Sequence, residues 1–494
     1  MHTQKKTLLI SLLLLVFCSG HPPCLAENSI KNAVVKIYAV YNTPSYHNPW
    51  QMLGQRTFHG SGCIIEGNRI LTNAHVVSDQ IFIQVRRAGI AKRYTAKLEV
   101  VAHECDLAIL SVADKDFFSG ATPVPIGSLP QIRDKVTVYG FPQGGDKLSI
   151  TEGIVSRVEH VSYAHSTAYL LACQIDASIN SGNSGGPVLK DNKIAGVAFQ
   201  EMSAANFENI GYMVPAPIIK HFLADIEDGH YDGTPSLGLS MQKLENPDMR
   251  RYYRLGEKES GALVNKIYPD SPAEGILQTG DIILEIDGIP IENDGTIEFR
   301  EGERTYFGLV LQKKFINDTV TLKILRKGQK STVTIQLTQP LDFDRLVPHM
   351  QHDRAPTYFI FGGLVFEPLT LNYLKEFGGD WSLFSPNELM HYYQNGEPDG
   401  WREVVVLTEV LADKSNIGYH EFEDNIIVKV NNRDITAVKD LVQAFEEHSG
   451  KFHTVEDIRG YKLILSDSAA KESMNRILKN YSISSDRSPD LQRN

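Results

Sequence analysis

The sequence predicts a mostly β protein in which an all-β barrel or sandwich comes first and two related modules follow. Short apolar or alternating runs, broken by Gly, Pro, Asn and Asp, fill residues 31–222 and are typical of closely spaced strands. Near residue 215 the period becomes helical, with one apolar face made of Ile218, Ile219, Phe222 and Ile226. This helix marks a domain boundary. Beyond it, residues 281–291 align without gaps with residues 425–435, so two related modules make up the C-terminal half.

Length and composition place the chain among globular proteins. Its 494 residues predict about three domains, and 42% hydrophobic with 22% charged residues argue against a disordered, collagenous or polytopic membrane protein. The formal net charge is -11 and no block rich in Lys and Arg stands out, so nucleic acid is not an expected partner.

Metal and nucleotide motifs are missing from the sequence. It contains no His-Glu-x-x-His, no Cys-x-x-Cys and no phosphate-binding Gly-Lys-Ser/Thr. We interpret the pair His103-Glu104 as solvation of a strand edge rather than as a metal site. The sequence therefore predicts no metal and no cofactor.

The N-terminal residues have the order of a secretory signal peptide. Two lysines precede the apolar run at residues 8–17, and a small-residue site ending at Ala26 follows it. The run is too short to span a bilayer comfortably, so we expect residues 1–26 to be removed and the rest to be exported without a stable membrane span. Three cysteines then remain, too few for a disulfide scaffold, and we expect them to be buried small hydrophobes: Cys63, Cys105 and Cys173.

The same patterns set the expected domain boundaries. After residues 1–26 we expect a first domain at 27–230, a module at 233–340, a polar linker at 341–356 and a longer module at 357–470. The longer module carries an aromatic-rich insertion near Trp381 to Trp401. Residues 471–494 are predicted to be a C-terminal tail that frays from residue 482.

Three segments of the first domain carry the groups that acyl transfer needs. His75 ends an apolar strand and turn, Asp106 heads an apolar strand, and Ser184 lies in a glycine-rich run. A serine nucleophile needs an imidazole to take its proton and a buried carboxylate to orient that imidazole. A glycine-rich turn also aims backbone N–H groups at the developing oxyanion, and Gly182 and Ser184 are the natural donors. Each segment alone has an ordinary structural explanation, but together they predict a catalytic triad.

As they stand here, TNAHVV at residues 72–77, DLAIL at 106–110 and GNSGGP at 182–187 resemble signatures of the HtrA/Deg (protease Do-like) serine peptidases. The larger second module is most similar to plant Deg proteins with two PDZ modules. The resemblance implies a chymotrypsin-like double β-barrel of the S1 peptidase clan, followed by two α+β PDZ-like domains, the second degenerate. It also implies an ATP-independent endopeptidase that degrades unfolded or damaged exported proteins, in the periplasm if the source is a Gram-negative bacterium. A proteolytically silent chaperone or PDZ scaffold is the alternative.

The resemblance also indicates where the P1 side chain of a substrate binds. A trypsin-type enzyme has an aspartate six residues before its serine, whereas this chain has Ser178 there, followed by Ile179. Ala198 lies on another expected wall. We therefore expect an uncharged S1 pocket that takes small or medium aliphatic side chains.

Each module has a loop that is similar to the carboxylate-binding loop of PDZ domains. In the first module it is Leu237, Gly238 and Leu239, whose backbone N–H groups would take the C-terminus of a peptide. An ordinary strand start with a glycine is the other interpretation. In the second module residues 361–364 occupy the corresponding place, and a docking role between subunits is favoured there.

Four aromatic residues gather near the start of the first domain: Tyr38, Tyr41, Tyr46 and Trp50. Full exposure of so many rings would be costly. Because the resemblance implies trimers held by N-terminal aromatics, we expect this stretch to form an interface in a homo-oligomer, a trimer or a multiple of trimers. The alternative is that the rings cover the barrel of their own chain.

Overall fold

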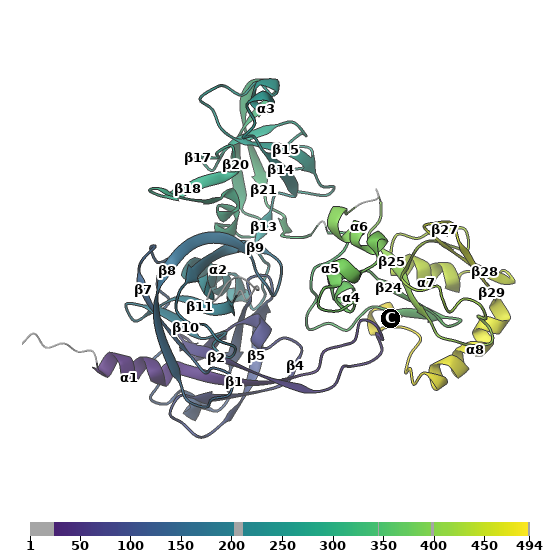
Figure 1. Cartoon of the computed structure of the whole chain (residues 1–494), viewed down its shortest axis with the longest axis horizontal. Coiled ribbons are helices and arrows are strands. Elements are labelled where there is room, and N and C mark those ends of the chain that lie inside the picture. Colours follow the sequence, from purple (N-terminus) through teal and green to yellow (C-terminus); the bar gives the residue numbers. More distant parts are fainter. Residues whose placement is uncertain (1–23, 202–210, 344, 397–399, 493–494) are drawn as a thin grey trace, which may run out of the picture.

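The computed structural model describes residues 24–201, 211–343, 345–396 and 400–492. They form two barrels, a module 1 (residues 233–340) and a module 2 (residues 357–491), and the fold is mostly β as predicted (Figure 1). The apolar run at residues 8–17 lies outside the described residues. Among the described residues, no helix is both long and apolar enough to cross a membrane.

The first domain consists of two closed barrels. Barrel 1 closes in the order β1-β2-β3-β6-β5-β4, with β1 (Val34–Tyr41), β2 (Arg56–Ile65), β3 (Arg69–Thr72), β4 (Gln80–Arg87), β5 (Tyr94–Ala102) and β6 (Leu107–Ser111). Barrel 2 closes in the order β10-β11-β12-β9-β8-β7, with β7 (Lys135–Gly140), β8 (Ser149–Ser162), β9 (Tyr169–Ile175), β10 (Pro187–Lys190), β11 (Lys193–Glu201) and β12 (Gly211–Pro215). Closure leaves no unpaired sheet edge.

Helices frame the barrels. Helix α1 (Cys24–Ala33) leads into β1, and α2 (Ala216–Asp225) leaves β12 with a proline in its first turn, where no backbone donor is lost. The buried face of α2 contains Ile218, Ile219 and Phe222, as its period predicted. The described residues of the first domain and the two modules also contain short 3-10 turns: η1 (Ala74–Val76), η2 (Lys115–Phe118), η3 (Ile226–Asp228), η4 (Phe307–Leu309), η5 (Leu311–Lys313) and η6 (Pro489–Leu491).

Each module is built on one sheet with helices or turns beside it. The sheet of module 1 runs β14-β15-β16-β20-β21. Its elements are β13 (Pro235–Ser236), β14 (Leu239–Lys243), α3 (Pro247–Tyr252), β15 (Ala262–Ile267), β16 (Ile282–Ile286), β17 (Ile289–Pro290), β18 (Thr296–Arg300), β19 (Glu303–Tyr306), β20 (Thr319–Arg326), β21 (Gln329–Gln336) and β22 (Gln339–Pro340).

The sheet of module 2 runs β23-β24-β25-β26-β28-β29. Its elements are β23 (Phe359–Phe361), β24 (Leu364–Pro368), α4 (Leu371–Lys375), α5 (Trp381–Phe384), α6 (Asn387–Asn395), β25 (Val405–Val410), β26 (Asn425–Val430), β27 (Arg433–Asp434), α7 (Val438–Glu446), β28 (Phe452–Asp457), β29 (Lys462–Ser466) and α8 (Asp467–Asn480).

The sequence repeat is also a structural repeat. Strands β16 and β26 carry it, and each has a partner strand on both sides. Each enters a two-residue turn with positive φ at both positions, 48° and 78° at Asp287 and Gly288, and 53° and 64° at Asn431 and Asn432. Such hairpin turns favour Asp, Asn and Gly. The change from Asp-Gly to Asn-Asn therefore preserves the turn.

The C-terminal residues are packed rather than frayed, which corrects the predicted tail at 471–494. Helix α8 follows β29 directly, and Ile483 and Leu491 are buried. Arg487 forms a β-bridge with Phe359, so the last residues pair with the edge strand β23. Two widely spaced apolar residues gave no periodic signal in the sequence, and the pairing satisfies backbone groups that fraying would leave to water.

An N-terminal arm, residues 42–55, reaches from barrel 1 to module 2 (Figure 1). Tyr46 is buried in an apolar cluster of module 2 and its linker, and its N–H donates to Glu376 Oε1 at 3.0 Å. Trp50 packs edge-on against Tyr358, with ring centroids 6.0 Å apart. Both rings therefore lie against module 2 of the same chain, whereas we expected an interface between subunits or, alternatively, contact with the barrel.

Module 1 docks on barrel 2 through buried polar contacts. Nδ1 of His160 in β8 lies 2.7 Å from Thr305 Oγ1, and its Nε2 lies 2.9 Å from Gln312 Nε2. An amide nitrogen only donates, so His160 accepts at Nε2 and donates from Nδ1 to the threonine hydroxyl. Burial lowers the pKa of His160 to about 4. The contact therefore holds a neutral imidazole.

The three remaining cysteines are buried and free, as expected: Cys63, Cys105 and Cys173. Burial raises the pKa of all three thiols, that of Cys173 to about 12. Each is therefore a small core residue rather than a reactive thiolate.

Candidate active site

The pairing of two strands brings His75 and Asp106 together. Strand β3 runs antiparallel to β6, so the turn after β3 and the turn before β6 meet at one edge of barrel 1. His75 Nδ1 lies 2.7 Å from Asp106 Oδ2, and the His75 N–H donates to Oδ1 at 2.9 Å. The Asp106 side chain is 1% exposed. A buried carboxylate at Nδ1 fixes the imidazole with Nε2 as its basic nitrogen.

The loop of Ser184 lies between the barrels. The Ser184 carbonyl accepts from the N–H of Ser61 in β2 at 2.8 Å, and the Gly185 N–H donates to the Ala198 carbonyl in β11 at 2.8 Å. Gly185 has a φ of 83°, and a Cβ there would lie 2.3 Å from Thr72 Oγ1. Glycine is required at this close approach, which sets Ser184 beside the turn that carries His75.

Gly182 adopts a left-handed backbone conformation that only glycine fits here. Its φ is 97°, and a Cβ would lie 2.5 Å from the Phe141 carbonyl oxygen. Among the described residues, neither the Gly182 N–H nor the Ser184 N–H has a hydrogen-bond acceptor. Both N–H groups therefore remain candidate donors to an oxyanion.

Ser61 positions this loop, and sequence reasoning missed it. Its fully buried hydroxyl donates to the Gly182 carbonyl at 2.7 Å and accepts from the Phe141 N–H at 2.8 Å. These bonds hold the Gly182 carbonyl toward Ser61. The only sequence signal is a serine between Gly60 and Gly62 in an apolar strand, and that pattern alone does not indicate a partner across the domain.

Of the residues predicted to form the S1 pocket, Ala198 contacts the glycine-rich loop, through backbone hydrogen bonds with Gly185 and Gly186. Ser178 is exposed and its carbonyl accepts from Thr151 Oγ1 at 3.1 Å, whereas Ile179 and Ala198 are buried. Asp176 is the acidic residue nearest to Ser178 in the sequence. It accepts from the Ile154 N–H at 2.5 Å and is held toward β8. Residues 202–210, which follow β11, lie outside the described residues.

Comparison with known proteins agrees with this architecture. Residues 60–197 match the trypsin-like peptidase domain, and residues 235–337 and 347–490 each match a PDZ domain. Protease Do-like 4, mitochondrial, of Arabidopsis thaliana is 40% identical over 462 residues, which cover 93% of this chain and 86% of the relative. The chain belongs to the HtrA/Do-like serine protease family. Protease Do-like 2, chloroplastic, of the same plant is 38% identical over 475 residues, covering 95% of this chain and 77% of the relative.

Among solved structures, the HtrA-type protease AlgW with tripeptide matches with a TM-score of 0.51 and 25% identity, over 64% of this chain and 96% of that one. The expected chymotrypsin-like double barrel followed by two PDZ domains is therefore confirmed, and modules 1 and 2 are PDZ domains. As an HtrA/Do-like family member the chain is a protease.

In module 1 of this HtrA/Do-like protease the predicted carboxylate loop is held by backbone hydrogen bonds and close packing. The carbonyls of Leu237 and Gly238 accept from backbone N–H groups at 3.2 and 3.0 Å. Gly238 has a φ of 65°, and a Cβ would lie 2.3 Å from Ser271 Cβ and 2.9 Å from the Phe343 ring of the linker. Leu239 begins β14, which lies at the end of its sheet order. An incoming peptide strand has an edge to pair with there.

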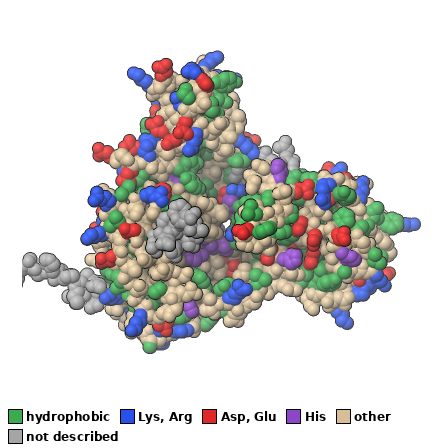
Figure 2. Space-filling view, viewed as in Figure 1, with side chains coloured by type: hydrophobic (Ala, Val, Ile, Leu, Met, Phe, Trp, Pro, Cys, Tyr) green, Lys and Arg blue, Asp and Glu red, His purple; other side chains and the backbone are tan. Residues whose placement is uncertain are grey.

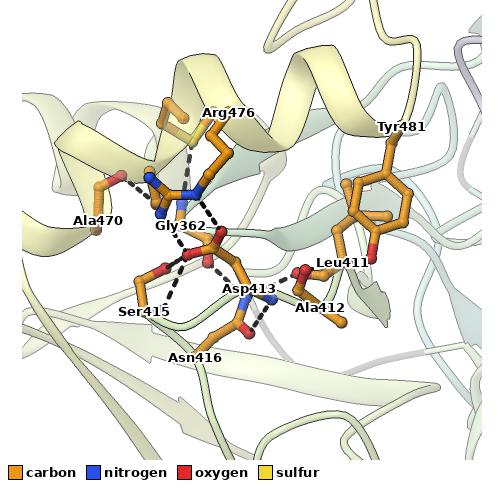
Figure 3. Close-up of polar contacts among 11 residues, drawn as sticks. Gly362, Leu411, Ala412, Asp413, Ser415, Asn416, Ala470, Arg476 and Tyr481 are labelled. Carbon is orange, nitrogen blue, oxygen red and sulfur yellow. Dashed lines mark hydrogen bonds and ion pairs between the residues drawn. The ribbon is translucent and has the colours of Figure 1, made fainter.

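The corresponding loop of module 2 is closed by helix α8 (Figure 3). The Gly362 N–H donates to Met474 Sδ at 3.2 Å, and Asn416 Nδ2 donates to the Gly362 carbonyl at 2.8 Å. Arg476 of α8 makes two 2.7 Å contacts with Asp413 and thereby holds the pKa of that carboxyl well below its usual range. The Gly362 N–H is therefore engaged within the chain. The Gly238 N–H of module 1 also has a partner, the Ser236 hydroxyl at 3.0 Å, so the two loops differ in the covering helix α8 rather than in a free glycine donor.

Proposed function

We propose that this HtrA/Do-like protease is an ATP-independent serine endopeptidase that degrades unfolded or damaged exported proteins. The observation that carries the proposal is the 2.7 Å contact between His75 Nδ1 and the buried carboxylate of Asp106. A surface histidine and aspartate would not need such burial. The glycine-rich loop beside them supplies the nucleophile and two free N–H donors.

In the proposed mechanism, His75 Nε2 takes the proton of the Ser184 hydroxyl as its oxygen attacks the peptide carbonyl. Asp106 stabilises the imidazolium that forms, and the Gly182 and Ser184 N–H groups bind the oxyanion. His75 then gives its proton to the leaving amine, which leaves an acyl-enzyme. Water, activated by the same imidazole, releases the acid product and restores Ser184.

The walls around Ser184 support an uncharged S1 pocket. Ser178 stands where a trypsin-type aspartate would be, and the buried Ile179 and Ala198 are apolar. Asp176 is held toward β8 by its bond to the Ile154 N–H. We therefore infer that small or medium aliphatic P1 residues are preferred.

Partners and location follow from the PDZ domains and the relatives. We infer that module 1 takes C-terminal peptides at Leu237, Gly238 and Leu239, whereas the closed loop of module 2 suits a role in assembly of a homo-oligomer. The relatives carry mitochondrial and chloroplastic names, which supports action in a separate compartment. The apolar run at residues 8–17 supports export for this chain.

A fluorophosphonate probe, which reacts only with an activated serine, tests the proposal. The purified full chain should be labelled, more strongly when unfolded substrate is present, and Ser184→Ala should not be labelled. If the wild-type protein stays unlabelled with and without substrate, the barrel is a silent platform and the chaperone or scaffold alternative is correct.

A further inference from the structure

Three histidines from distant parts of the chain meet beside the proposed triad. His103 lies in the turn between β5 and β6, His165 in the turn between β8 and β9, and His352 in the linker before module 2. One ring nitrogen from each lies within 4.8 Å of the others. Figure 2 shows histidine side chains in the hollow between the barrels and module 2.

A carboxylate fixes which nitrogen of His103 is basic. His103 Nε2 lies 2.8 Å from Asp353 Oδ2, and because a carboxylate accepts, this nitrogen carries the proton. Nδ1 therefore keeps its lone pair, and it faces His165 Nε2 at 2.9 Å. An imidazole that donates to a carboxylate from one nitrogen while the other points into a cluster is the arrangement found behind metal-bound histidines.

The linker histidine is held against the other two. The Asp79 N–H donates to Asp353 Oδ1 at 2.6 Å, and the Asp353 N–H donates to Asp79 Oδ1 at 2.8 Å, so this part of the linker is anchored to barrel 1. The His352 ring stacks on His165, with centroids 3.9 Å apart, and its Nε2 lies 3.4 Å from the His165 carbonyl. That contact leaves Nδ1 of His352 as its basic nitrogen.

We propose that His103, His165 and His352 form a binding site for a divalent transition cation that prefers imidazole ligands, such as Zn²⁺. Three imidazoles leave a fourth tetrahedral position for water. With Zn–N distances of about 2.05 Å, ligand nitrogens lie about 3.3 Å apart. The side chains must therefore rotate on binding, and the stacked rings of His165 and His352 must turn so that both lone pairs point at one ion. The bound ion joins both barrels to the linker.

The site has a consequence for catalysis, which rests on the proposed function. The His165 and His75 ring centroids are 6.1 Å apart, and the His103 carbonyl accepts from the Asp106 N–H at 3.2 Å. A dication at the cluster opposes the positive charge that His75 gains when it takes the serine proton. Zn²⁺ should therefore slow cleavage, and a chelator should restore it.

Binding is tested without activity, in full-length Ser184→Ala protein stripped of metal with a chelator. Calorimetric titration with Zn²⁺ should show one site per chain, and Co²⁺ should give the intense visible absorption of a tetrahedral site. His352→Gln should weaken Zn²⁺ binding at least tenfold and remove the Co²⁺ bands. His349→Gln is the matched control, because His349 is on the same linker but packs against Tyr393; it should bind as the parent does.

His103→Gln repeats the test from the barrel side and should weaken binding similarly. The proposal is overturned if the parent takes up no Zn²⁺ at one equivalent, or if His352→Gln and His103→Gln bind as tightly as the parent. Because Ser184→Ala protein cannot turn over, either result leaves the proposed protease function untouched. Conversely, if the fluorophosphonate probe does not label the wild-type protein, the protease proposal fails and the metal-site proposal is unaffected.

Discussion

Gln312 of module 1 donates its side-chain amide hydrogen to Nε2 of His160 in barrel 2, 2.9 Å away across the domain boundary. The other end of the amide is also engaged, because Gln312 Oε1 accepts from the Leu171 N–H at 3.2 Å. Gln312 therefore cannot turn its oxygen toward His160 without losing a buried bond. Protonation of His160 would set two donors face to face.

This contact makes docking of module 1 sensitive to acid. The pKa of His160 is lowered to about 4 by burial, so between about pH 6.5 and that value the unfolded chain binds a proton that the folded chain does not. The neutral His160 therefore contributes to the free energy of unfolding. This contribution is fully present above about pH 6.5, is lost as the pH falls toward 4, and amounts to about 3 kcal/mol at most.

Thermal melts at about pH 7.5 and about pH 5 should show a smaller acid-induced drop in Tm for His160→Gln than for the wild type. The control is His230→Gln, whose side chain is 74% exposed near the same boundary; it should keep the wild-type drop. An unchanged drop in His160→Gln would assign the acid sensitivity to other groups.

Replacement of the proposed nucleophile should abolish cleavage. Ser184→Ala should lower casein turnover by about 10⁴- to 10⁶-fold, because the triad acts as a unit. Asp106→Asn should keep the geometry but favour the wrong imidazole tautomer, at a cost of about 10⁴-fold. Substantial cleavage by purified Ser184→Ala would disprove the assignment.

Loss of the Ser61 hydroxyl should reduce kcat without much change in KM. Ser61→Ala frees the Gly182 carbonyl and leaves the Phe141 N–H without its acceptor. One buried hydrogen bond corresponds to about 1 kcal/mol, so kcat should fall about five- to tenfold. Steady-state kinetics on a short aliphatic peptide measures kcat and KM separately. The control is Ser119→Ala, at an exposed site after η2, which should have the kcat and KM of the wild type. If Ser61→Ala also has the kcat and KM of the wild type, Ser61 does not position the loop.

Cleavage sites should follow the uncharged pocket. Mass spectrometry of digested unfolded proteins should show aliphatic P1 residues, since Ser178 stands where a basic P1 side chain would need an acid. Ser178→Asp should add cleavage after Lys and Arg. A dominant Lys or Arg preference in the wild type would contradict the uncharged pocket.

Peptide binding to module 1 should depend on a free carboxylate and on Gly238. A peptide ending in Val or Leu should bind more tightly than its C-terminal amide in calorimetry. Gly238→Ala should lose this affinity, because its Cβ would lie 2.3 Å from Ser271 Cβ. Gly275→Ala is matched, with a φ of 73° and nothing within 4 Å, and should retain binding. Equal affinity for acid and amide would leave module 1 as an assembly element.

Local patterns in the sequence were sufficient to predict an all-β first domain and the repeat, whereas the double barrel was implied by the family resemblance. Alternating runs mark strands, and the Asp287-Gly288 turn and its Asn431-Asn432 counterpart are specified by two residues each. The motif around His75 and the segment beginning at Asp106 also belong to neighbouring strands, so their meeting follows from the fold.

What the sequence did not indicate depends on residues far apart in the chain. His103 and Asp353 are separated by 250 positions, and Ser61 and Gly182 by 121. Neither pair has a periodicity or a spacing that links them. For that reason the sequence supports only strand-edge solvation for the pair His103-Glu104, and it carries no signal for Ser61.

The arm that joins barrel 1 to module 2 sets an order of events during synthesis. Tyr46 and its partner Glu376 are 330 positions apart, so the ribosome releases the arm long before the surface that covers it exists. Domains generally fold as they emerge, and the barrels can close while Tyr46 and Trp50 still face water. Nascent or C-terminally truncated chains would carry an exposed aromatic patch, which is the kind of surface that promotes aggregation. Only completion of the last module buries it.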